Sequence, residues 1–145
     1  MKIKNPRSAM LSNFEVLQVL TEQQDKQKAE QTDDPNANVA GNLRTVQFEV
    51  TEYLKDTPCS TQDPQQIEAF LESMEPYKLT RAEKLQLLNL RPRSVVEIYI
   101  IVEECEERFT EEEVEQILNN ISSILPRDDD YAAEEYEEED TEMAQ

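Results

Sequence analysis

The sequence predicts an all-α protein, and three observations lead to that prediction. Glycine occurs once in 145 residues, at Gly41, which is too few for the tight turns of a sheet fold. Five segments begin with Ser, Thr or Asp followed three positions later by Glu or Gln, the pattern of a capping box. Apolar residues then recur at spacings of three and four, the period of an amphipathic helix.

The N-terminal part supplies the first expected helix and then a polar stretch. Ser12 and Glu15 form the first capping pair, and Val16, Leu17 and Leu20 follow them. Residues 21–42 contain Gln, Lys, Asp and a proline but no apolar stripe. We expect residues 1–20 to hold the first helix and residues 21–42 to form a flexible linker.

Residues 43–54 fit two patterns. A helical face fits Leu43, Val46, Val50, Tyr53 and Leu54, whereas the alternation of a strand also fits Val46, Phe48 and Val50. The length of the segment favours the helix.

Four more helices are expected within residues 43–126, which we predict to form one compact helical domain. Their capping pairs are Asp63 with Gln66, Thr80 with Glu83, Ser94 with Glu97, and Thr110 with Glu113. The apolar residues that follow are Ile67, Phe70, Leu71 and Met74; Leu85 and Leu88; Ile98, Ile101, Val102 and Cys105; and Val114, Ile117, Leu118, Ile121 and Leu125. Pro64 suits a first helical position, and Pro126 ends the last helix. A domain of this size is marginal for a core of its own.

Residues 95–102 are β-branched enough to resemble a buried strand. The capping pair before them favours a helix, and the segment runs smoothly into residues 103–107. We therefore expect one helix that places Ile98, Val102 and Cys105 on a single face.

The composition argues against an enzyme. The chain has no His, the commonest general base and metal ligand, and its two cysteines cannot form a four-thiolate zinc site. We expect no catalytic, metal-binding or cofactor-binding residues. The longest apolar run, residues 95–102, is far too short to span a bilayer, so no membrane partner is expected.

Charge makes direct nucleic-acid binding unfavourable. Lys and Arg number 14 against 33 Asp and Glu, for a formal net charge of −19. Residues 127–145 are expected to be a disordered acidic tail. The basic residues Lys78, Arg81, Lys84, Arg91 and Arg93 are interpreted as ordinary surface charge, and Arg108 as a partner for helix carbonyls.

Several segments resemble a known family. They are LSNFEVL at 11–17, TPC at 57–59, LTRAEKLQLLNLRP at 79–92, VEI at 96–98 and VEECEERF at 102–109. Together they resemble the smaller stalk subunit of RNA polymerase III, a family also called the calcitonin gene-related peptide receptor component. The resemblance covers about residues 8–126, and these segments occur in the same order as in the family.

The resemblance implies a fold and a role. The fold is an N-terminal partner-docking segment followed by a helical domain like the helicase-and-RNase-D C-terminal domain. The role is a non-catalytic, nuclear subunit that pairs with a larger stalk subunit containing an oligonucleotide-binding barrel. The pair joins the polymerase core and contacts initiation factor IIIB during synthesis of transfer RNA and 5S ribosomal RNA. Nucleic-acid contact is then indirect or weak.

The apolar N-terminal surface suggests where a partner docks. The candidate interface residues are Leu11, Asn13, Phe14, Leu17, Leu43, Val46 and Val50. An ordinary core role for each of them stays open. The competing hypotheses are an acidic helical adaptor or chaperone outside the polymerase, including one in receptor signalling, and a free nucleic-acid-binding module.

Overall fold

The computed structural model describes residues 4–5, 8–33 and 41–125. Every regular element in these ranges is helical, which confirms the all-α prediction. The chain divides into two units, one ending at Ser60 and the other starting at Thr61. The expected helical domain of residues 43–126 is therefore divided, because its first helix belongs to the first unit.

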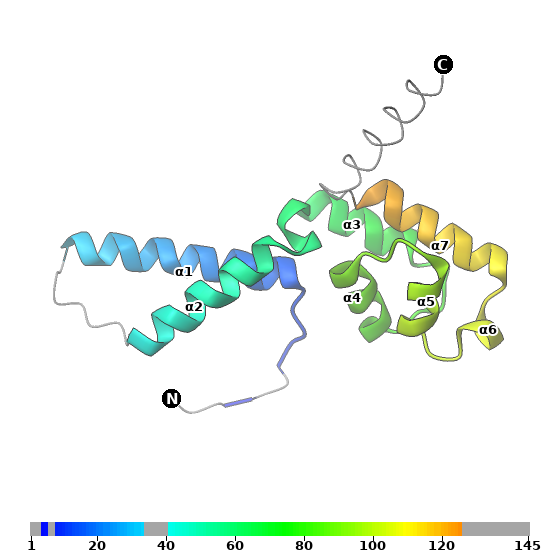
Figure 1. Ribbon diagram of the computed structural model, residues 1–145, viewed down its shortest axis with the longest axis horizontal. Coiled ribbons are helices and arrows are strands. Elements are labelled where there is room, and N and C mark those ends of the chain that lie inside the picture. The colour runs from blue at the N-terminus through cyan, green and yellow to red at the C-terminus, as the bar shows by residue number, and fades with distance from the viewer. Residues whose placement is uncertain (1–3, 6–7, 34–40, 126–145) are drawn as a thin grey trace, which may run out of the picture. The chain divides into compact units, whose positions relative to one another are not determined.

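The first unit contains α1 (Asn13–Asp33) and α2 (Gly41–Lys55), which pack side by side (Figure 1). The helix favoured for residues 43–54 is present. A short 3₁₀ helix, η1 (Pro58–Thr61), follows, and Cys59 within it is buried.

The expectation of a flexible linker is wrong for residues 21–33, which continue α1. Gln, Glu, Lys and Ala are good helix formers without any apolar stripe. Lys28 also lies 3.5 Å from Asp25 one turn earlier, a pairing that supports an exposed helix. Gly41 and Asn42, also expected in the linker, begin α2, while residues 34–40 lie outside the described ranges.

The described part of the second unit contains five helices around one core. They are α3 (Pro64–Ser73), α4 (Arg81–Leu90), α5 (Val95–Ile101), α6 (Cys105–Arg108) and α7 (Glu111–Ile124). α7 packs against α3 and α5, and α4 packs against the same two helices. The core residues are Phe70, Met74, Leu87, Leu88, Ile98, Val102, Cys105, Val114, Ile117, Ile121 and Leu125.

The predicted caps account for where these helices begin. Ser12, Asp63, Thr80 and Thr110 each accept a hydrogen bond from the backbone three residues on, and the Glu or Gln there accepts one in return. At Ser94 the box is half formed, because the Glu97 carboxylate instead accepts from the Arg93 N–H at 2.6 Å.

The expectation of one helix from residue 95 through Cys105 is wrong. α5 ends at Ile101, Val102 is extended, and Glu104 adopts a left-handed conformation with φ of 50° before α6 begins. Ile98, Val102 and Cys105 are nevertheless all buried. The break lets the chain turn while it keeps its apolar side chains in the core.

The interpretation of Arg91 as surface charge is also wrong. Arg91 is 3% exposed, and its guanidinium Nε donates to the Leu125 carbonyl oxygen at 2.6 Å. It therefore satisfies a carbonyl at the end of α7 that has no partner within that helix. Its φ of 46° terminates α4 in the left-handed conformation.

Arg108 has a wider role than the expected contact with helix carbonyls. It donates to both carboxylate oxygens of Glu83, at 2.6 and 3.2 Å, and to the Lys78 carbonyl at 2.8 Å. The hydrogen bonds that Glu83 accepts from Arg108, and to a lesser extent those from Thr80, lower the pKa of Glu83 to about 2, although burial acts in the opposite direction. The pair joins the start of α4 to α6.

Candidate docking surface

All seven predicted interface residues lie in the first unit. Leu11 precedes α1, and α1 carries Asn13, Phe14 and Leu17; α2 carries Leu43, Val46 and Val50. Leu11, Leu43 and Val46 are exposed, and the other four are half-buried. The structure therefore gathers the set onto one helical pair. Which of them meet a partner stays a prediction.

The outer face of α2 carries an apolar stripe that the packing leaves open. Leu43, Val46, Val50 and Tyr53 follow one another at spacings of three, four and three, so they share one helix face. Val46 is 59% exposed and Tyr53 is 70% exposed. We call these four residues the α2 stripe. The predicted interface did not include Tyr53, although its spacing of three residues from Val50 places it on the same helix face.

The contact between α1 and α2 is unusually polar. Gln47 and Thr51 are buried on α2, and Leu54 is the apolar residue buried beside them. Gln47 Nε2 donates to Gln23 Oε1 at 3.1 Å, and Gln24 Nε2 donates to Thr51 Oγ1 at 3.1 Å. We call these four Gln and Thr side chains the polar seam.

The first unit therefore places several polar groups between its helices beside the buried Leu54, and it leaves the apolar α2 stripe outside. Each hydrogen bond of the polar seam contributes only about 0.5–1.5 kcal/mol to stability. Full burial of a Val or Leu side chain contributes about 1.5–3 kcal/mol, and much of that gain remains unused on the α2 stripe. A second protein that covers the stripe would bury these side chains and so add this stabilisation.

The described residues give little support for other kinds of site. Among them, no group of three or more His, Cys, Asp and Glu residues is placed to hold a metal ion. Within the same part of the chain, no helix is both long and apolar enough to cross a membrane. Cys105 is buried as predicted, and burial raises the pKa of its thiol.

The described residues thus form an all-helical fold with an apolar stripe open on α2. Residues 10–125 match the protein family described as RNA polymerase Rpb4, and the chain belongs to this family.

Three curated proteins give the family a more specific context. A fission yeast protein, DNA-directed RNA polymerase III subunit rpc9, is 35% identical over 129 residues, covering 87% of this chain and all of the relative. The Dictyostelium discoideum protein of the same name is 31% identical over 136 residues, covering 88% and 96%. The budding yeast RPC9 is 50% identical over 46 residues, covering 32% and 29%.

Proposed function

We propose that this chain is the Rpb4-type subunit of DNA-directed RNA polymerase III. Two relatives named as subunits of that enzyme align with it over nearly their whole length. Both align over the first unit as well as the second, so the proposal concerns the whole described chain. In this role the subunit is nuclear and non-catalytic, and it acts by binding other proteins.

The observation that carries the proposal is the α2 stripe. An exposed row of apolar side chains is unusual on a lone soluble protein and marks a surface for another protein. We propose that this partner is the larger stalk subunit, with which the chain forms the stalk heterodimer on the polymerase core. The other predicted interface residues, Leu11, Asn13, Phe14 and Leu17, lie just before and at the start of α1, and we propose that they contact the same partner. The stalk then contacts initiation factor IIIB during initiation at genes for small structured RNAs.

Partner binding would also stabilise the first unit. A protein that binds only the folded form shifts the folding equilibrium by mass action. Covering Val46 and Tyr53 would remove apolar area from water without disturbing the hydrogen bonds of the polar seam. Co-expression with the larger stalk subunit should therefore raise both the soluble yield and the melting temperature.

The experiment that tests this function is purification of the tagged chain from cells, with identification of the proteins that co-purify. Subunits specific to RNA polymerase III are expected. Recovery of RNA polymerase II subunits instead would be consistent with membership of the Rpb4 family. It would contradict the proposal that the chain belongs to RNA polymerase III. Recovery without any polymerase subunit would favour the acidic-adaptor alternative, including a receptor-signalling role, which none of the three relatives' names mentions.

A further inference from the structure

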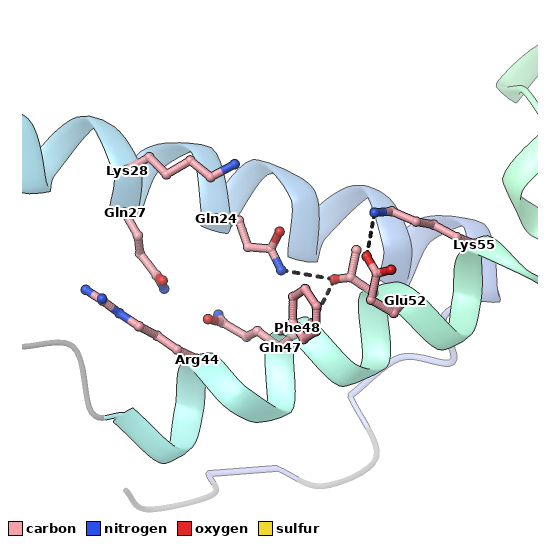
Figure 2. Close-up of a pocket in the computed structure, with 9 residues that line it drawn as sticks. Gln24, Gln27, Lys28, Arg44, Gln47, Phe48, Glu52 and Lys55 are labelled. Carbon is pink, nitrogen blue, oxygen red and sulfur yellow. Dashed lines mark hydrogen bonds and ion pairs between the residues drawn. The ribbon is translucent and has the colours of Figure 1, made fainter.

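A groove runs along the helical pair on a different face of α2 from the stripe. Its volume is about 420 Å³, and both helices contribute to its walls. Figure 2 shows Gln24, Gln27 and Gln47 between α1 and α2, with Lys28 along α1 at the edge of the group. The lining residues that matter here are Lys28, Arg44, Gln47, Phe48, Glu52 and Lys55. With 100° of rotation per residue, the groove residues of α2 are centred on another side of the helix from the α2 stripe.

The charge of the groove is opposite to that of the chain. Three basic side chains line it against one carboxylate, Glu52, whereas the whole chain carries a net charge of −19. Lys55 Nζ lies 2.7 Å from Glu52 Oε1, and Lys28 Nζ lies 3.5 Å from Asp25 Oδ1. Both pairs are solvent-exposed, and such pairs contribute only about 0–1 kcal/mol. An incoming acid can therefore redirect these cations at little cost.

One wall holds a buried acceptor without a donor. Gln47 is 5% exposed, and its Oε1 has no hydrogen-bond partner among the described residues. A buried polar atom left in this state costs about 1–3 kcal/mol. A peptide N–H that reaches Gln47 Oε1 in the groove would recover part of this free energy, while Gln47 Nε2 keeps its hydrogen bond to Gln23 Oε1. At the rim, Phe48 is 58% exposed and offers an aromatic face to an apolar side chain.

We propose that this groove binds an extended, acidic segment of another protein. Its carboxylates pair with Lys28 and Lys55, and a backbone N–H donates to Gln47 Oε1. This site goes beyond the proposed function, because the stalk partner is assigned to the α2 stripe on another face of the helix.

The test uses the full-length chain and a short fluorescein-labelled oligoglutamate peptide, with oligoglutamine as the neutral probe. Fluorescence anisotropy should show that oligoglutamate binds, that oligoglutamine binds more weakly, and that added salt weakens binding of oligoglutamate. Lys28→Glu should weaken oligoglutamate binding about fivefold or more. Lys26→Glu is the matched control, since Lys26 is exposed on the same helix outside the groove, and it should change binding less than twofold.

A second readout follows the acceptor itself. The side-chain amide NMR signals of Gln47 should shift when oligoglutamate is added, whereas those of exposed Gln86 in α4 should not. Equal weakening by Lys26→Glu and Lys28→Glu, or unmoved Gln47 signals, would overturn the proposal. The Lys28→Glu variant should co-purify with polymerase subunits as the wild type does. A negative result for peptide binding in the groove can therefore be distinguished from a negative result for the proposed polymerase function.

Discussion

Glu104 is held in a backbone conformation that suits glycine better than glutamate. Its φ of 50° lies in the left-handed region, where a side chain costs roughly 1–2 kcal/mol. The residue is exposed, and the reversal between α5 and α6 depends on its backbone. Arg91 has the same conformation, but there the buried guanidinium compensates through its hydrogen bond to Leu125.

Glu104→Gly should therefore stabilise the protein, by about 0.5–1 kcal/mol after the entropy cost of glycine is subtracted. The free energy of unfolding from denaturant titration is the measurement. The control is Glu115→Gly, at an exposed position inside α7, where glycine should destabilise by about 1 kcal/mol. A loss of stability at both positions would mean that the Glu104 backbone is not strained.

The Glu83–Arg108 pair makes stability depend on pH. The pKa of Glu83 is lowered from 4.5 to about 2, so the folded state favours the ionised carboxylate. A lowered folded-state pKa contributes stability above pH 4.5 and loses it as the pH falls toward 2. Because Arg108 remains 27% exposed, water screens the pair, and we expect it to contribute about 1–2 kcal/mol.

Glu83→Gln tests this contribution, because glutamine can still serve in the capping box. The difference in unfolding free energy between wild type and variant should be present at neutral pH. It should then shrink as the pH falls from about 4.5 to about 2. A difference that stays constant over this window would assign the effect to packing instead of ionisation.

At the scale of helices, capping chemistry was the most informative signal. The pairs at Ser12, Asp63, Thr80 and Thr110 marked helix starts correctly, because each side chain satisfies a specific backbone group nearby. Helix ends were harder to predict. The end of α5 depends on Glu104 entering a left-handed conformation, which neither propensity nor periodicity indicates for glutamate.

Long-range polar contacts also escaped prediction. The second half of α1 has no apolar stripe, and the polar seam pairs Gln24 with Thr51 and Gln23 with Gln47 across more than twenty residues of sequence. Likewise, Arg91 and Arg108 contact partners far along the chain, so the burial of Arg91 and the pairing of Arg108 with Glu83 could not be derived locally. The α2 stripe could be predicted, because its residues recur at helical spacing within one element.

Two valines separate the core face of the α5 region from its surface. Val102 is 2% exposed and Val96 is 65% exposed. Val102→Asp should destabilise by about 3–5 kcal/mol, because it leaves a buried carboxylate without a partner. Val96→Asp makes the same chemical change in water and should shift stability by about 0.5 kcal/mol or less. Thermal melting of both variants is the measurement, and similar melting temperatures would show that the core is wrongly assigned.

At the scale of the whole molecule, the core of the second unit reaches Leu125, which is fully buried. Residues 127–145 lie outside the described ranges, and their lack of apolar periodicity remains the basis for expecting an acidic tail. Removing residues 127–145 should leave the melting temperature and partner binding unchanged. Removing residues 125–145 should lower the melting temperature, since Leu125 is then lost from the core. If the variant that lacks only residues 127–145 unfolds, the expectation that these residues form a tail outside the core is wrong.

The whole chain is best understood as two helical units with different interiors. The second unit has an apolar core, whereas the first has a polar seam and an open apolar stripe. This contrast is the physical reason for assigning partner binding to the first unit. The assignment predicts that substitutions on the α2 stripe affect assembly far more than they affect the folding of the second unit.

The affinity of the chain for the larger RNA polymerase III stalk subunit, measured by calorimetry, tests this assignment most directly. The double variant Leu43→Asp with Val46→Asp should bind about 100-fold more weakly, a loss of about 2.7 kcal/mol. Val96→Asp, at an exposed valine of the second unit, should bind like the wild type. If the double variant keeps its helical circular dichroism and binds with wild-type affinity, the assignment of the α2 stripe as the docking surface is wrong.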